Sequence, residues 1–164
     1  MKTLTIVRHG KSSWKDMTLR DIERPLNKRG RRDAPEMGRR IHEHGIRPSL
    51  ILSSPAKRAW TTAKIVASAI NYPREFLQKE DALYLASVNR ILDVIVAQDD
   101  RFNSIMLFGH NPGFTDFANF LVPGLTNNLP TSGVVSVEID REDWSLYDQP
   151  QTNLLVHDWP KKNL

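Results

Sequence analysis

The segment Leu4-Thr5-Ile6-Val7-Arg8-His9-Gly10 changes from apolar to charged at Arg8. Its first four residues are apolar or β-branched, which is typical of a strand buried on both faces. The same change occurs twice more, where Leu50-Ile51-Leu52 precedes Ser53-Ser54-Pro55 and where Ser104–Phe108 precedes Gly109-His110-Asn111-Pro112. We therefore predict three buried strands, each of which leads directly into a polar loop.

Between these strands the apolar residues follow a helical period. The segment from Lys28 to His44 has this spacing, and Gly45 is a candidate end for the helix. Two residues are candidate N-caps at the start of this helix. A cap at Asn27 puts Pro35 inside the helix, whereas a cap at Asp33 puts Pro35 in the first turn.

Capping residues and periodicity predict the remaining elements. Ser54 and Ser87 are candidate N-caps of two helices, and Asn111-Pro112 opens a third. Val134–Ile139 alternates with the period of a strand, and Leu154–His157 is a further candidate strand. Strands that alternate with helices favour an α/β fold with a largely parallel sheet. Because no linker, repeat or low-complexity tract interrupts the sequence, we treat residues 1–164 as a single domain.

The composition excludes several classes of protein. The 164 residues are 40% hydrophobic and 26% charged, as in soluble globular proteins. With no cysteine, the chain can form no disulfide framework, cysteine metal site or cysteine nucleophile. No apolar run reaches the roughly 20 residues that span a bilayer, and the short run before Arg8 is no signal peptide. We therefore expect a cytoplasmic protein with no membrane partner. The formal net charge of +4 favours anionic partners.

The three polar loops carry side chains that suit an anion. In open α/β sheets, ligands bind at the carboxyl ends of the strands, where helix N-termini present free N–H groups. Arg8 and His9 follow the first strand, Arg58 lies at the start of the helix after the second, and His110 follows the third. Two arginines and two histidines that converge on one crevice would bind a tetrahedral dianion. The sequence therefore predicts a phosphate site.

Three motifs of this chain resemble those of the histidine phosphatase (phosphoglycerate mutase-like) superfamily. They are Arg8-His9-Gly10, the run Ser54-Pro55-x-x-Arg58-Ala59-x-x-Thr62-Ala63, and Gly109-His110. Arg8–Trp14 together with Asp21–Gly30 is similar to the SixA-type phosphohistidine phosphatase subgroup. The resemblance implies a single-domain, three-layer α/β/α fold with a mostly parallel central sheet and no large cap insertion. It also implies a phosphatase that needs no metal ion or other cofactor.

The resemblance further implies that His9 attacks phosphorus to form a phosphohistidine, which water then hydrolyses. A histidine with a pKa of about 6.5 is largely neutral at pH 7, so it can attack without an activating base. Its other ring nitrogen needs a fixed acceptor, for which we expect a backbone carbonyl. Arg8, Arg58 and His110 would surround the phosphoryl oxygens. Arg24 is a further candidate phosphate ligand. Alternatively, it is only a surface charge in the basic stretch Arg20–Arg47.

The sequence leaves the general acid open. Many phosphatases of this superfamily protonate an alkoxide leaving group with a carboxylic acid, and Glu80 and Asp81 lie in the expected region. An imidazole leaving group departs more easily and needs less help from an acid. A chain of this length has little room for a lid, and an open site admits a side chain on a protein surface. We therefore expect a phosphohistidine protein as the substrate.

Two alternatives remain at this point. One is a phosphomonoesterase for a small metabolite, with Glu80 or Asp81 as general acid. The other is a non-catalytic basic binding module that uses the stretch Arg20–Arg47, for example on nucleic acid. Because acidic residues interleave with the arginines of this stretch, we expect no nucleic-acid partner. The sequence gives no indication of an oligomeric state.

Overall fold

The apolar segments form one six-stranded sheet. The computed structural model describes residues 1–162, and the strands lie in the order β3-β2-β4-β1-β5-β6. Their bounds are β1 (Lys2–Arg8), β2 (Leu50–Ser53), β3 (Gln78–Lys79), β4 (Ser104–Gly109), β5 (Val134–Ile139) and β6 (Asn153–Asp158). The first four strands pair in parallel, whereas β5 is antiparallel to both β1 and β6. The predicted, mostly parallel sheet is confirmed.

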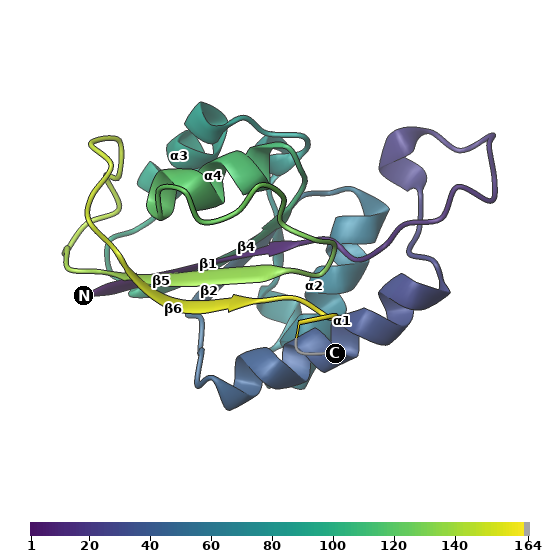
Figure 1. Ribbon diagram of the computed structural model, residues 1–164, viewed down its shortest axis with the longest axis horizontal. Coiled ribbons are helices and arrows are strands. Elements are labelled where there is room, and N and C mark those ends of the chain that lie inside the picture. Colours follow the sequence, from purple (N-terminus) through teal and green to yellow (C-terminus); the bar gives the residue numbers. More distant parts are fainter. Residues whose placement is uncertain (163–164) are drawn as a thin grey trace.

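Four helices cover the two faces of this sheet (Figure 1). The pair α1 (Lys28–Glu43) and α2 (Lys57–Ala69) lies on one face, and the pair α3 (Val88–Val96) and α4 (Gly113–Leu121) lies on the other. Short 3-10 turns in the loops are η1 (Asp21–Glu23), η2 (Arg74–Phe76) and η3 (Asp81–Leu83). The arrangement is the three-layer α/β/α fold that the resemblance implied. Within residues 1–162, no helix has both the length and the apolar character needed to cross a membrane.

The central strand β1 explains why the sheet needs a helical layer on each face. Successive side chains of a strand point to opposite faces. Leu4 and Ile6 accordingly pack in the core formed with α3 and α4, whereas Val7 packs in the core formed with α1 and α2. All three side chains are completely buried. A strand that is apolar on both faces is stable only between two covering layers.

Helix α1 uses the first of its two predicted starts. The Asn27 side chain accepts a hydrogen bond from the Gly30 N–H at 2.9 Å, and Pro35 lies inside the helix. Asp33 is therefore not a cap. It is a buried helical residue whose carboxylate lies 3.5 Å from Arg29. The predicted stop is confirmed, because the helix ends just before Gly45, which has a positive φ of 76° that glycine adopts easily.

The capping predictions for the other helices had mixed outcomes. Ser87 is the N-cap of α3, and its hydroxyl accepts a hydrogen bond from the Arg90 N–H at 3.3 Å. Ser54 is not a cap, because α2 begins later, at Lys57. The Ser54 N–H donates to the Phe108 carbonyl at 2.9 Å and so extends the pairing of β2 with β4. A residue still held by the sheet cannot also start the helix.

Candidate active site

The carboxyl ends of three neighbouring strands bring the predicted site together. Since β2, β4 and β1 are adjacent and parallel, the residues that follow them meet at one edge of the sheet. A cavity of about 290 Å³ opens there, and its lining includes Arg8, His9, Asp21, Arg24, Arg58 and His110. The two arginines and two histidines predicted from the sequence therefore share one cavity with Arg24.

His9 is held in one tautomer by the backbone. Its Nδ1 lies 2.7 Å from the carbonyl oxygen of Gly10, which can only accept, so Nδ1 carries the proton and Nε2 keeps its lone pair. Burial lowers the pKa of His9 to about 3, and the charges of Arg58, Arg8 and Arg24 act in the same direction. The ring is therefore neutral at pH 7, as a nucleophilic nitrogen must be.

The loop that carries His9 is tied to α2 at Gly10. The Gly10 N–H donates to the Thr62 hydroxyl at 3.0 Å, and that hydroxyl donates to the Arg58 carbonyl at 2.7 Å. A Cβ at Gly10 would lie 3.1 Å from the Leu26 side chain and 3.3 Å from the backbone of Gly30, so a larger residue does not fit without displacement. These contacts fix the position of His9 relative to Arg58.

His110 lies against His9 with ring centroids 5.2 Å apart. Its Nε2 is 2.7 Å from the Ser54 hydroxyl, and its Nδ1 is 3.4 Å from Nη2 of Arg58. Because a guanidinium only donates, Nδ1 is an acceptor and Nε2 carries the proton. Burial lowers the pKa of His110 to about 3, with further lowering from His9 and Arg58. The Ser54 hydroxyl therefore orients His110, whereas the sequence predicted it as the N-cap of α2.

Arg58 and Arg24 are buried, Arg8 is half-buried, and, in the part of the chain that the structure describes, two of these arginines have an unpaired Nε atom. Arg58 is 3% exposed, and it donates from Nη1 to the Asp21 carbonyl at 2.7 Å and from Nη2 to the Asp21 carboxylate at 2.9 Å. Arg8 donates from Nη1 to the Leu129 carbonyl at 3.0 Å. Within residues 1–162, the buried Nε atoms of Arg8 and Arg58 have no hydrogen-bond partner. These two N–H groups lack the acceptor that buried donors normally have.

Arg24 joins this group from the loop between β1 and α1. It is 8% exposed, donates from Nη1 to the Ser12 hydroxyl at 2.7 Å, and lies 3.6 Å above the ring of Trp14. Figure 1 shows that this loop, with η1, projects beyond the carboxyl edge of the sheet. Arg24 therefore contributes a third guanidinium to the cavity, although it lies far along the loop from His9.

The two carboxylates proposed as general acids lie elsewhere. Glu80 accepts a hydrogen bond from the Ala82 N–H at 3.2 Å and so caps η3, and Asp81 is exposed. Neither is among the residues that line the cavity. The carboxylate that the cavity does contain is Asp21, which the sequence analysis quoted only as part of a motif. Its spacing of three residues from Arg24, as in an ion pair across one helical turn, was the available signal.

Asp21 is kept ionised by its neighbours. Burial by itself would raise the pKa of this carboxyl. Hydrogen bonds from Tyr84, Arg58 and Arg24 outweigh burial and hold the pKa well below its usual range. Burial and the hydrogen bond to Asp21 raise the pKa of Tyr84. Asp21 therefore carries a negative charge at any pH near neutrality. Among residues 1–162, no three or more His, Cys, Asp or Glu side chains form a cluster that could hold a metal ion.

Comparison with known proteins identifies the family to which this geometry belongs. The model of the histidine phosphatase superfamily (branch 1) matches residues 4–83, which include His9, Arg24 and Arg58. The crystal structure of SixA from Agrobacterium tumefaciens, a candidate phosphohistidine phosphatase, has a TM-score of 0.83 and 27% identity over 97% of this chain and 98% of that chain. The chain belongs to the histidine phosphatase superfamily. The SixA-type subgroup predicted from the sequence is confirmed, and the protein is a phosphatase.

Other proteins are similar to this chain in fold or in part of the sequence. The structure of the protein histidine phosphatase SixA complexed with tungstate shares the fold, with a TM-score of 0.79 and 22% identity over 96% of this chain and 97% of that one. An uncharacterized chloroplastic protein of Arabidopsis thaliana is 29% identical over 87% of this chain and 69% of its own length. A 2,3-bisphosphoglycerate-dependent phosphoglycerate mutase of Thermobifida fusca is 39% identical, but over only 40% of this chain and 27% of the mutase.

Proposed function

We propose that this protein removes the phosphoryl group from phosphohistidine in another protein, through a covalent phosphohistidine on His9. The state of the His9 ring carries this proposal. Its Nδ1 is committed to the Gly10 carbonyl at 2.7 Å, and its depressed pKa leaves Nε2 as a free lone pair inside a cavity with three guanidinium groups. A neutral nucleophile beside fixed positive charge is what transfer of a phosphoryl dianion requires.

The proposed reaction has two balanced steps. In the first, the lone pair of His9 Nε2 forms a bond to phosphorus while the P–N bond of the substrate breaks, and the departing imidazole nitrogen keeps that electron pair and takes up a proton. In the second, a water oxygen attacks phosphorus, the bond to Nε2 breaks, and phosphate leaves as a proton passes to solvent. Arg8 and Arg58 surround the phosphoryl oxygens in both steps, Arg24 supplies a further guanidinium, and the neutral His110 lies against His9.

The leaving group supports a P–N substrate over an alkyl ester. An alkoxide needs a protonated acid at the moment it departs, whereas an imidazole departs with much less help. Asp21 is the carboxylate in the cavity lining, and its low pKa keeps it ionised, so it has no proton to give. Glu80 and Asp81 are not part of that lining. The metabolite phosphomonoesterase with either residue as acid therefore has less support from the geometry.

The surroundings of the cavity support a protein as the substrate. The side chains of Trp14 and Leu85 belong to the cavity lining and are more than half exposed. Beside the cavity lies a groove of about 580 Å³, whose lining contains four basic side chains and no carboxylate: Lys15, Lys28, Arg29 and Arg31. The two hollows take alternating residues from the same segments, since Ser12, Trp14 and Arg24 line the cavity and Ser13, Lys15 and Pro25 line the groove. We name these four residues the basic groove. It suits an acidic surface on the protein that carries the phosphoryl group.

A labelling experiment in EDTA tests the proposal. Incubation with a labelled phosphoryl donor is expected to give an acid-labile, base-stable adduct in the wild type and in His44→Ala, a control that changes an exposed histidine. His9→Ala is expected to remain unlabelled. Equal labelling of His9→Ala, or labelling that requires added metal, would contradict the mechanism.

A comparison of substrates then tests the specificity. Turnover of a phosphohistidine protein and of an alkyl phosphate is measured for the wild type, Glu80→Gln and Asp81→Asn. We expect the phosphohistidine protein to be the better substrate and both variants to leave its turnover unchanged. Turnover of the alkyl ester alone, with a requirement for one of the two carboxylates, would support the metabolite phosphatase instead.

A further inference from the structure

One carboxylate joins the parts of the cavity that come from separate segments of the chain. Oδ1 of Asp21 accepts from Nε of Arg24 at 3.2 Å and from Nη2 of Arg24 at 3.0 Å. Oδ2 accepts from Nη2 of Arg58 at 2.9 Å and from the Tyr84 hydroxyl. The backbone carbonyl of Asp21 accepts a further bond from Nη1 of Arg58 at 2.7 Å. Residues in η1, in α2 and after η3 are thereby fixed to one another.

The cavity needs such a group because its cations repel each other. Arg8, Arg24 and Arg58 line one cavity of about 290 Å³. Burial is the largest cause that lowers the pKa of Arg8, and the charge of Arg58 is the second. Without a counter-charge, guanidinium groups this close would turn away from one another. Asp21 pairs with two of the three guanidinium groups and so offsets part of their repulsion. Lys11 also lines the cavity, so its lining keeps a net positive charge, which suits a phosphoryl dianion.

We propose that Asp21 is a positioning residue, whose carboxylate aligns Arg24 and Arg58 for the transition state and at the same time weakens the binding of free phosphate. The proposal rests on phosphoryl transfer at His9. Arg58 is 3% exposed, and two of its nitrogens are directed by Asp21, so its unpaired Nε–H has a fixed direction. Alignment of this kind acts on turnover, because it stabilises the transition state more than the ground state.

The weakening of ground-state binding follows from charge alone. An oxyanion in the cavity competes with the Asp21 carboxylate for the same guanidinium groups and is repelled by it. Removal of this charge is therefore expected to tighten the binding of inorganic phosphate, which is also the product. Removal also frees the two arginines to adopt other orientations, which slows the chemical step. The two effects have opposite signs, and general damage to the fold would weaken both binding and turnover.

The test compares Asp21→Asn, which keeps the size of the side chain and removes its charge, with Glu23→Gln. Glu23 lies in the same turn η1, pairs with Arg20 at 3.3 Å and is exposed, so it is a matched control. The dissociation constant of inorganic phosphate is measured by calorimetry, and kcat is measured with the phosphohistidine protein and with an aryl phosphate. For Asp21→Asn we expect phosphate to bind about tenfold more tightly and kcat to fall about 10- to 100-fold. Glu23→Gln is expected to change neither quantity.

Other outcomes overturn the proposal. A parallel loss of phosphate affinity and kcat would mean that Asp21 only supports the fold. No change in either quantity would mean that Arg24 and Arg58 do not depend on it. An alkaline fall in the activity of the wild type that is absent from Asp21→Asn would make Asp21 a proton donor. Phosphate binding is measured without turnover, so if the wild type forms no phosphohistidine, the proposed function fails while the role of Asp21 in setting anion affinity is still tested.

Discussion

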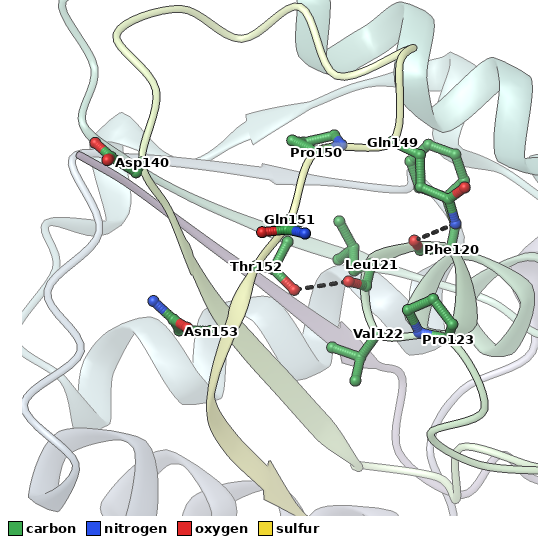
Figure 2. Close-up of a pocket in the computed structure, with 10 residues that line it drawn as sticks. All are labelled: Phe120, Leu121, Val122, Pro123, Asp140, Gln149, Pro150, Gln151, Thr152 and Asn153. Atoms are coloured by element: carbon green, nitrogen blue, oxygen red, sulfur yellow. Dashed lines mark hydrogen bonds between the residues drawn. The ribbon is translucent and has the colours of Figure 1, made fainter.

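The two ends of the sheet carry hollows of very different character. At the carboxyl ends of β1, β2 and β4 lies the cavity of about 290 Å³ that contains His9. A larger pocket of about 570 Å³ lies at the opposite end, next to the last residue of β5 and the first residue of β6 (Figure 2). Its lining includes apolar and amide side chains and one ionisable residue, Asp140. Volume alone would therefore not single out the cavity that contains His9.

The polar groups of the larger pocket serve the fold. The Thr152 hydroxyl donates to the Leu121 carbonyl at 2.7 Å, and the Gln149 side-chain amide donates to the Phe120 carbonyl at 3.0 Å (Figure 2). Both bonds satisfy carbonyl groups in the last turn of α4, which have no partner within the helix. In the His9 cavity, by contrast, buried Nε–H groups remain unpaired. Within residues 1–162, unpaired donors and converging charge distinguish the reactive hollow from the structural one.

The largest expected difference between the two ends comes from His9, the proposed nucleophile. His9→Asn is expected to lower turnover by at least about 10⁴-fold, because the remaining groups can bind the phosphoryl group but cannot form the covalent intermediate. Circular dichroism and the unfolding temperature should remain close to those of the wild type. Residual turnover above about 1% in a variant purified free of contaminating phosphatase would contradict the role of His9.

A change at Arg58 tests whether charge alone accounts for the reactive end. Arg58→Lys keeps the positive charge but loses the planar group that contacts Asp21 and His110 together. We expect kcat/KM to fall about 100- to 1000-fold, since the phosphate ligand and its alignment are lost at once. Arg39→Lys, at an exposed position of α1, serves as the control. Near-normal activity of Arg58→Lys would mean that a point charge is sufficient.

Because His9 and His110 are buried, we expect the stability of the protein to depend on pH. The pKa of His9 and of His110 is about 3 in the folded protein, against 6.5 as the ordinary value. The unfolded chain therefore binds more protons between these values, so the free energy of unfolding falls as the pH decreases from about 6.5. Each histidine contributes at most about 1.4 kcal/mol per pH unit. Urea unfolding at pH 7, 6 and 5 measures this slope. The double variant His9→Asn/His110→Asn should reduce it, and an unchanged slope would contradict the assignment.

The basic groove tests the proposal that the substrate is a protein. Lys15→Glu/Lys28→Glu is expected to raise KM for a phosphohistidine protein about 5- to 10-fold, because the acidic surface then meets like charge. Turnover of an aryl phosphate, which does not reach the groove, should not change. Lys161→Glu, far along the chain at an exposed position, is the control. An equal effect on both substrates would place the groove inside the catalytic machinery instead.

The smallest expected effect belongs to the larger pocket. Thr152→Ala removes the hydroxyl that satisfies Leu121, so we expect a loss of about 1 kcal/mol in the free energy of unfolding. The kinetic constants for either substrate should stay within experimental error. A selective change in kcat or KM without a change in stability would show that this pocket takes part in function after all.

The sequence predicted the elements whose signals are local. The apolar and β-branched composition of segments such as Leu4–Val7 predicts buried strands, and the polar residues at their carboxyl ends predict the edge of the sheet where the site lies. The choice between caps at Asn27 and Asp33 could not be made locally, because both are good caps in isolation. Packing decides it. The helix that starts after Asn27 buries Gly30 against the backbone of Lys11, where a Cβ would lie only 2.3 Å from the Lys11 carbonyl oxygen.

Ser54 and Asp21 show where local signals stop. Ser54 has the sequence context of an N-cap, yet its backbone remains paired to β4 and its hydroxyl contacts His110, 56 residues away. Asp21 contacts Arg58 across 37 residues and Tyr84 across 63. No spacing rule connects residues so far apart in the chain. Their meeting depends on how the loop after β1 folds back over α2.

The sequence by itself therefore determined the class of fold, the family, and the placing of Arg8, His9, Arg58 and His110 at one edge of the sheet, because periodicity and strand order are properties of short segments. Only the tertiary structure decided which carboxylate enters the cavity, which ring nitrogen of His9 is free and which arginine donors remain unpaired. Those properties depend on burial and on the distances between charges, and both arise only when distant segments pack together.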